Sequence, residues 1–592
     1  MASSSNSSPS DVSQLLQVAE LSDTWWAECM MPHLLKAKAA GSLAATCKQL
    51  RSLCQRCAGE LRLAGQDLQQ LQALANIPQR FASCKQLQFW LSSREEAACH
   101  LPAALDALAG LTALCRLALT VQSQGTASDP VAMAAALGGL ATWQLRQQQA
   151  LWPLPSSYGV HLRFACSWEA NSLTWQAVGR LQHLSSLSVE TAAGHHATIT
   201  MCSLSALAPL HSCLRRLKVT SASAAPDLHQ HQDYSFLSSL TTLTGLHLPV
   251  AAAHQHLNHI SCCTGLQSLA FKARTGSDTA LRAAECAALQ HLVHLTQLSC
   301  TGFVLEDPTC SFLAALQQLR KLTMWQSLAA LQSRRQLPAA LAGLTKLTRL
   351  VFQLLEQPAP QQGVQAGAGT AAAAGAATAA HAVFPSVRCL CAGGPVPFEA
   401  FPSLQEVTQT SGWQPSALCS LRQHCSQLTK LSAGADVARG QAASLLSDAA
   451  AAERIRAIRG LSALRSLKCL AVAPNSEAEV AAVASLQQVR HLSVIAPYTS
   501  ESTVEGLSQL GAARQLRTLQ LLLPGAMKYH LGTAYAQRLL IAVQHAESVV
   551  LRVPAAHVQN MQDIEQHARL AINAAGVDGP AVVKVERGTT MS

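Results

Sequence analysis

The sequence predicts an α/β solenoid, an irregular stack of repeats with short parallel strands on a concave side and helices on the convex side. Two observations predict this fold class. A leucine-rich pattern recurs along the chain, as in "LAGLTALCRLAL" at 108–119, "LSSLTTLTGLHL" at 237–248 and "LAGLTKLTRLVF" at 341–352. In addition, the 592 residues exceed what one compact core organises, whereas a stack gains core with every repeat.

The period of the repeat is measured at the leucine two places before the end of each pattern. Leu217 and Leu246 are 29 residues apart, Leu246 and Leu269 are 23 apart, and most neighbouring separations fall between 22 and 31. The aligned leucines are Leu117, Leu187, Leu217, Leu246, Leu269, Leu298, Leu322, Leu350, Leu390, Leu431, Leu470, Leu492 and Leu519. Weaker members are Leu87, Leu162, Val407 and Val550.

Each pattern combines two kinds of spacing. Its first part repeats leucine every three residues, which is typical of a helical turn, and its last part alternates apolar and polar residues, which is typical of a strand. The L-x-x-L-x-L core, as in Leu347, Leu350 and Phe352, resembles the leucine-rich repeat family from about 87 to 553. That family places Asn after the strand, and this chain has "LALTVQS" and "LKVTSAS" there, so we expect an irregular solenoid.

The segment 21–63 predicts helices ahead of the repeats. Its stretch "SLAATCKQLRSLC" carries an apolar helical stripe and is similar to the second half of an F-box, which binds the Skp1-type adaptor of cullin ubiquitin ligases. The resemblance implies a ligase substrate receptor whose adaptor-binding residues are Leu43, Ala44, Cys47 and Leu50. The Leu-Pro opening of an F-box is absent and Pro32 interrupts the first helix, so a helical cap on the repeat core is the alternative.

These observations divide the chain into four parts. We expect a disordered tail at 1–10, a helical F-box-like or capping segment at 11–66, a solenoid at 67–553 and a helix-strand cap with a tail at 554–592. Within the solenoid, the Ala/Gly-rich stretch at 356–383 predicts a disordered loop.

The sequence offers no motif for catalysis or for a cofactor. It has no G-x-S-x-G elbow, no phosphate-binding G-x-x-x-x-G-K-[ST] loop and no H-E-x-x-H helix, so we expect a protein that is not an enzyme. In "HQHLNHISCC", the residues His256, His259 and Cys263 would share one helical face, as zinc ligands do, but Cys263 falls in a core position of the repeat. We therefore expect no metal.

The N-terminal sequence and the cysteines predict a soluble protein of the cytoplasm or nucleus. The start "MASSSNSSPSDVSQLL" has neither a basic nor an apolar signal region, although a Ser-rich transit peptide remains an alternative, and no stretch is apolar enough to span a membrane. Twenty cysteines in such a chain are expected to be reduced thiols. Cys263, Cys391 and Cys469 fall in core positions of the pattern.

The residues on either side of each aligned leucine are expected to face the exposed concave side, because side chains alternate along a strand. Basic residues predominate there, Glu406 being the main acid, and the formal net charge is +10. The candidate partner-binding residues are Arg116, Arg216, Lys218, Lys321, Arg349 and Lys430. Such a face would attract an acidic protein partner, the alternative being that the cations only keep a leucine-rich surface soluble. Nucleic acid is not expected, since no aromatic residues are interleaved with the charges.

Overall fold

The chain divides into two compact units, unit 1 (Met1–Arg274 and Ala287–Leu295) and unit 2 (Thr275–Cys286 and Thr296–Ser592). No described helix has the length and apolar character needed to cross a membrane. The computed structural model describes residues 60–64, 77–81, 84–91, 94–108, 111, 113–123, 130–149, 159–166, 172–190, 201–220, 235–248, 258–272, 279–280, 283–301, 303–304, 307–325, 336–353, 383–393, 396–409, 415–433, 448–474, 476–495, 506–522, 543, 545–554 and 582–588.

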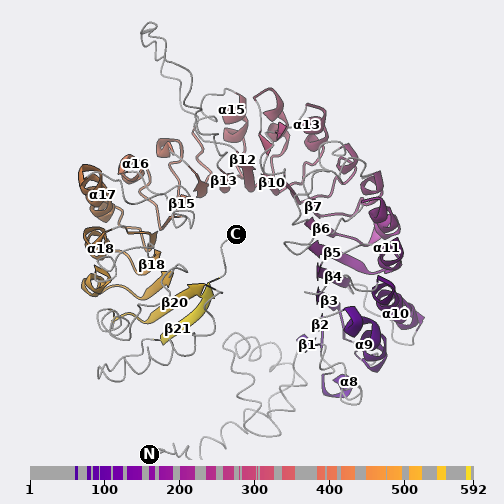
Figure 1. The fold of residues 1–592 in the computed structure, drawn as a ribbon. Coiled ribbons are helices and arrows are strands. Elements are labelled where there is room, and N and C mark those ends of the chain that lie inside the picture. Colours follow the sequence, from indigo (N-terminus) through magenta and orange to yellow (C-terminus); the bar gives the residue numbers. More distant parts are fainter. Residues whose placement is uncertain are drawn as a thin grey trace, which may run out of the picture. The chain divides into compact units, whose positions relative to one another are not determined.

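Unit 1 contains a sheet of parallel strands that pair in the order in which they follow along the chain (Figure 1). These strands are β1 (Glu60–Ala64), β2 (Gln86–Leu91), β3 (Arg116–Ser123), β4 (Gly159–Cys166), β5 (Leu184–Glu190), β6 (Arg216–Thr220), β7 (Gly245–Leu248) and β8 (Ser268–Lys272). Helical segments alternate with them and lie on one side of the strands. They are α8 (Ile77–Arg80), α9 (Arg94–Ala107), α10 (Pro130–Gln149), α11 (Ser172–Gly179), η2 (Met201–Ser212) and η3 (Ser235–Ser239).

Unit 2 repeats this plan, with parallel pairing between successive strands of its main sheet. Its strands are β10 (Gln297–Thr301), β12 (Lys321–Trp325), β13 (Arg349–Gln353), β14 (Cys389–Ala392), β15 (Glu406–Gln409), β16 (Lys430–Ala433), β17 (Cys469–Val472), β18 (His491–Ile495), β19 (Thr518–Leu522), β20 (Ser548–Pro554) and β21 (Val582–Gly588). The short strands β9 (Thr279–Ala280) and β11 (Phe303–Val304) form a separate pair.

Helical segments also lie on one side of the main sheet of unit 2. They are η5 (Asp307–Ala315), α15 (Gln336–Ala342), η6 (Phe398–Ala400), α16 (Pro415–His424), α17 (Asp448–Gly460), η9 (Leu461–Ala463), α18 (Glu477–Ala484) and η10 (Leu507–Ala512). Helix α13 (Ala283–Gln290) is divided between the units, since its residues up to Cys286 belong to unit 2 and those from Ala287 belong to unit 1.

The core of each unit lies between its strands and its helices and is built mainly of leucine. In the repeat at 341–352, Leu341, Leu344, Leu347 and Leu350 are all fully or almost fully buried, and Phe352 is 1% exposed. Leu350 is level with Leu322 on one neighbouring strand and with Leu390 on the other, so leucines stack from repeat to repeat. Both units are therefore α/β leucine-rich-repeat solenoids, as the sequence predicts.

The repeated leucines adopt a helical turn first and a strand second. The backbone N–H of Leu344 donates to the carbonyl of Leu341 at 3.1 Å, and that of Leu347 donates to Leu344 at 2.9 Å, which is the three-residue pattern of a 3₁₀ turn. The strand β13 begins two residues later, at Arg349. The three-residue spacing of leucines therefore belongs to the turn, and the alternation of apolar and polar residues belongs to the strand that follows it, as predicted.

Successive repeats are joined by backbone hydrogen bonds where each strand begins. The N–H groups of Thr348 and Arg349 both donate to the carbonyl of Arg320 in the preceding repeat, at 2.9 and 3.0 Å. The N–H groups of Arg490 and His491 donate to the preceding carbonyl in the same way. Hydroxyl groups add to some of these connections between repeats, since Thr348 Oγ1 donates to the Arg320 carbonyl at 3.2 Å. These bonds join the repeats without the Asn side chains that the resemblance would lead one to expect.

The strand register corrects the alignment of the repeats at two places. Leu119, rather than Leu117, is level with Leu162 and, through it, with Leu187. The reason is that Val160 takes the position level with Leu117, and the register between β4 and β5 shifts between Val160 and His161. Near the C-terminal end of the main sheet of unit 2, Leu519 on β19 pairs with Val549 on β20 rather than with Val550.

Two further expectations are also corrected. The first described strand, β1, pairs with β2 although it lies in the segment 11–66, for which the sequence predicts helices. Cys391 and Cys469 are half-buried at strand positions that alternate with the core, so the prediction that they occupy core positions was wrong, whereas Cys263 is fully buried as predicted. Residues 356–382 of the predicted loop at 356–383, most of segment 11–66 and most of the predicted C-terminal cap lie outside the described residues.

Candidate interaction surface

The strands of unit 1 present a second face that none of the described helices covers, and we call it the open face of unit 1. It carries the side chains that alternate with the buried leucines along β1 to β7. Its charged, aromatic and histidine residues are Glu60, Arg62, Trp90, Arg116, His161, Arg163, Glu190, Arg216, Lys218 and His247. Trp90 is 49% exposed, which is unusual for a large apolar side chain and typical of interaction surfaces.

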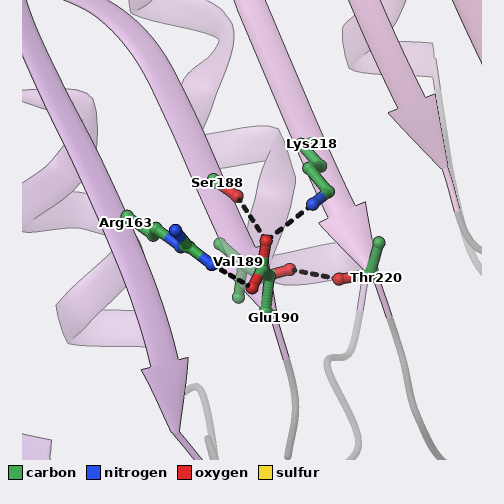
Figure 2. Close-up of polar contacts among 6 residues, drawn as sticks. All are labelled: Arg163, Ser188, Val189, Glu190, Lys218 and Thr220. Carbon is green, nitrogen blue, oxygen red and sulfur yellow. Dashed lines mark hydrogen bonds and ion pairs between the residues drawn. The ribbon is translucent and has the colours of Figure 1, made fainter. Parts of the chain in front are cut away.

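Glu190 is the centre of a fixed charge cluster on this face (Figure 2). Its Oε2 accepts from an Nη nitrogen of Arg163 on β4 at 2.9 Å, and its Oε1 accepts from Nζ of Lys218 on β6 at 2.6 Å. Ser188 Oγ also donates to the carboxylate, at 3.5 Å. Because these partners come from three adjacent strands, the sheet itself holds the cluster together.

The electrostatics of this cluster favour the ionised carboxylate. Partial burial by itself raises the pKa of Glu190, but the hydrogen bonds and charges of Lys218 and Arg163 outweigh it. The pKa of Glu190 therefore lies below its ordinary value. As a result, one carboxylate offsets much of the charge of two cations and fixes the positions of both.

A second group on the open face of unit 1 contains His161. Arg116 on β3 donates from Nε to Nε2 of His161 on β4 at 2.9 Å, and Ser185 Oγ lies 3.5 Å from the same nitrogen. Burial lowers the pKa of His161, and the charges of Arg116 and Arg216 lower it further, to about 4. The ring is therefore neutral near pH 7, which leaves Nε2 able to accept the hydrogen bond from Arg116.

Unit 2 has an open face of its own, again formed by strand residues that alternate with the core. Lys321, Arg349, Cys389, Glu406 and Lys430 occupy equivalent positions on successive strands. Lys430 Nζ lies 4.0 Å from a carboxylate oxygen of Glu406, with both side chains about half exposed. Burial raises the pKa of the Cys389 thiol, and the nearby Glu406 raises it further.

The predicted partner-binding cations are distributed over both open faces. Arg116, Arg216 and Lys218 lie on the open face of unit 1, and Lys321, Arg349 and Lys430 lie on that of unit 2. The predicted adaptor-binding residues Leu43, Ala44, Cys47 and Leu50 lie outside the described residues.

Sequence reasoning missed several members of the open face of unit 1. Trp90, His161, Arg163 and Glu190 all lie on strands that are longer than the predicted pattern or shifted relative to it. The alternation in "VHLRFAC" was an available signal, because His161 and Arg163 alternate there with Leu162 and Phe164. The ion pairs themselves have no such signal, since Glu190 and Lys218 are 28 residues apart.

The described residues contain no group of three His, Cys, Asp or Glu side chains arranged to hold a metal ion. Of the proposed zinc set, His256 lies outside the described part of the chain and Cys263 is fully buried. The Cys263 thiol donates to the carbonyls of Leu237 and Leu240 at 3.5 Å. Burial raises the pKa of this thiol to about 12, so it stays protonated and packs in the core of the repeat.

Comparison with known proteins gives structural similarities only, since no protein-family model and no curated protein matches the sequence. An internalin from Listeria monocytogenes is 13% identical, with 83% of this chain and 90% of that chain covered and a TM-score of 0.26. The leucine-rich-repeat ectodomain of the plant membrane receptor kinase GASSHO1/SCHENGEN3 from Arabidopsis thaliana, solved in complex with CASPARIAN STRIP INTEGRITY FACTOR 2, is 13% identical. There 81% of this chain and 56% of that chain are covered, with a TM-score of 0.28, so this chain spans little more than half of that ectodomain.

Proposed function

We propose that this protein is an interaction scaffold that binds a protein partner on the open faces of its strands and contributes no catalytic groups. The observation that carries the proposal is the open face of unit 1, which presents both the half-exposed Trp90 and two arginines, Arg116 and Arg163, whose positions are fixed by hydrogen bonds to His161 and Glu190. Tryptophan and arginine dominate the energetics of protein interfaces because they combine a large contact area with directed polar groups. A rigid sheet presents them with little loss of conformational entropy on binding.

Site-specific photo-crosslinking in cells tests this proposal. A photoreactive residue replaces Thr120 on the open face of unit 1, and in the matched control it replaces Arg146 on helix α10 of the same unit. We expect a discrete protein to be crosslinked from Thr120 and not from Arg146. Crosslinking that is equal at both positions, or absent from both, would contradict the proposal.

A charge-reversal experiment follows once that partner has been purified. Reversing Arg216, Lys321 and Arg349 to Glu is expected to weaken its binding and to reduce the salt dependence of the dissociation constant. The exposed Arg465 outside the strands is reversed as the control. Unchanged binding by the triple variant would remove these cations from the interface.

A finer proposal is that the scaffold is the substrate receptor of a cullin-type ubiquitin ligase. It is supported by the similarity of "SLAATCKQLRSLC" to an F-box and by the position of this stretch before the repeats. Binding of the full chain to a purified Skp1-type adaptor tests it, with Leu43→Glu and Leu50→Glu as variants expected to abolish binding. If the intact chain does not bind the adaptor, the protein is a repeat scaffold without a ligase connection.

A further inference from the structure

Two arginines on the open face of unit 1 carry charge that no described carboxylate offsets. Glu190 binds Arg163 and Lys218, and Glu60 pairs with Arg62 at 3.0 Å. By contrast, Arg116 donates to the neutral ring of His161, and Arg216 has no ion-pair partner among the described residues. Among the described residues, no carboxylate therefore offsets the positive charge of either guanidinium group.

The surface between these two arginines is lined by small residues. Arg116 on β3 is level with Gly159 on β4. Ser186 on β5 is level with His161 on one neighbouring strand, β4, and with Arg216 on the other, β6. Gly159 is tightly placed, since a Cβ atom there would lie 2.8 Å from Ser185 Oγ. The short side chains of these glycine and serine residues therefore leave space above the sheet between the two cationic side chains.

His161 positions Arg116 for binding. Because Nε of Arg116 is committed to His161 Nε2, the guanidinium plane has a defined orientation and its two terminal Nη nitrogens remain available as donors. Two parallel N–H groups on one guanidinium match the two oxygens of a carboxylate or phosphate. Lysine would lack this planar fork, so the identity of this residue matters as well as its charge.

We propose that Arg116 and Arg216, with His161 as the positioning residue, form an anion-binding site over Gly159, Ser185 and Ser186. This site takes the carboxylate or phosphate of an acidic protein segment, and the inference rests on the proposed function of the open faces. Trp90 lies on the same face, two strands from β4, where it offers the apolar part of that segment a contact surface. A peptide fits better than a nucleic acid strand, since this face has one exposed aromatic residue among its described members rather than a series for stacking bases.

Binding of a fluorescent oligoglutamate peptide to the full chain, followed by fluorescence anisotropy, tests the site. We expect Arg116→Gln and Arg216→Gln each to weaken binding by about tenfold, the loss of one charge-assisted hydrogen-bonding group. The matched control is Arg163→Gln, which removes the same charge from the same face but acts on an arginine already bound by Glu190. We expect this control to stay within about threefold of the wild type.

Two further probes define the ligand chemistry. A phosphoserine peptide without other acidic residues shows whether phosphate is preferred to carboxylate, and oligoglutamine measures binding that is independent of charge. His161→Leu removes the acceptor that orients Arg116, and we expect it to weaken oligoglutamate binding severalfold although no charge is lost. Retained far-ultraviolet circular dichroism shows that each variant is folded.

The outcomes separate this inference from the broader proposal. Equal losses of oligoglutamate affinity in the three arginine variants would mean that the peptide is attracted only by the long-range electrostatic field. Failure of the wild type to bind either acidic peptide would mean that there is no anion-binding site. Either result overturns the inference but leaves open-face crosslinking to a partner intact. Site-specific oligoglutamate binding without any partner crosslinked from the open face would instead overturn the proposed function alone.

Discussion

At the scale of single residues, the open face of unit 1 shows how neighbouring strands decide the state of a titratable group. Glu190 and His161 lie on adjacent strands and both have a lowered pKa. For Glu190 the opposing cations outweigh the effect of burial, whereas for His161 burial and the cations act in the same direction. Cations on neighbouring strands therefore favour a charged carboxylate at Glu190, through Lys218 and Arg163, and an uncharged imidazole at His161, through Arg116 and Arg216.

The lowered pKa of His161 predicts a pH-dependent contribution to stability. The unfolded chain binds a proton as the pH falls through 6.5, whereas the folded chain does not until about pH 4. The stabilisation is thus complete above pH 6.5 and is lost between that pH and about 4. His161→Gln is expected to flatten this part of the pH profile of the thermal unfolding midpoint. The exposed His424→Gln is the control, and identical profiles for both variants would contradict the prediction.

A buried ion pair in unit 2 predicts a large effect of a small change. Arg454 Nε on α17 lies 3.2 Å from a carboxylate oxygen of Glu479 on α18, and the Glu479 side chain is 2% exposed. Glu479→Gln leaves the largely buried Arg454 side chain, which is 15% exposed, without its counter-charge, so the local free energy of unfolding should fall by about 3 kcal/mol. Hydrogen exchange of α17 and α18 measures this loss. The exposed Glu453→Gln on α17 is expected to cost little, and equal costs would refute the prediction.

At the scale of elements, the turn and the strand of each repeat depend on one stack of leucines. Leu347 is fully buried at the point where the 3₁₀ turn leads into β13. Leu347→Ala would leave a cavity and lower local stability by about 2 to 5 kcal/mol. Because a repeat contacts mainly its neighbours, we expect faster hydrogen exchange in β12, β13 and β14 and unchanged exchange in β2 to β5.

The exposed neighbour Lys346→Ala provides the control for that experiment, since its side chain lies outside the core. It should leave the exchange rates of all these strands close to those of the wild type. Exchange that accelerates equally in both units after Leu347→Ala would show that the whole chain unfolds cooperatively, which contradicts nearest-neighbour stability.

The elements also show what could be predicted from the sequence. The strands around Leu217 and Leu350 were predictable because burying leucine at a regular period is the main driving force of the fold. The shift that aligns Leu119 with Leu187 was not, because it depends on strand length and on an irregularity between Val160 and His161. The candidate site depends on that register. The contacts of Glu190 could therefore not be predicted from the sequence.

At the scale of the whole molecule, the described cysteines differ in accessibility. Cys262 is exposed while its neighbour Cys263 is buried, and burial raises the pKa of Cys263 and of Cys425 to about 12. Iodoacetamide should therefore modify Cys262 in the native protein and leave Cys263 and Cys425 unmodified until denaturant is added. Peptide mass spectrometry measures this, and modification of both members of the adjacent pair at similar rates would contradict it.

The backbone joints between repeats, such as the two N–H groups of Thr348 and Arg349 on the Arg320 carbonyl, have an evolutionary consequence. Main-chain donors are supplied by every residue except proline, so these bonds survive most substitutions. Mutation can therefore rewrite the chemistry of the open faces while leaving the architecture in place. Whole repeats can also be duplicated or deleted, since a new copy brings its own donors and its own acceptor. A lineage of such proteins can thus acquire new partners faster than it could acquire a new fold.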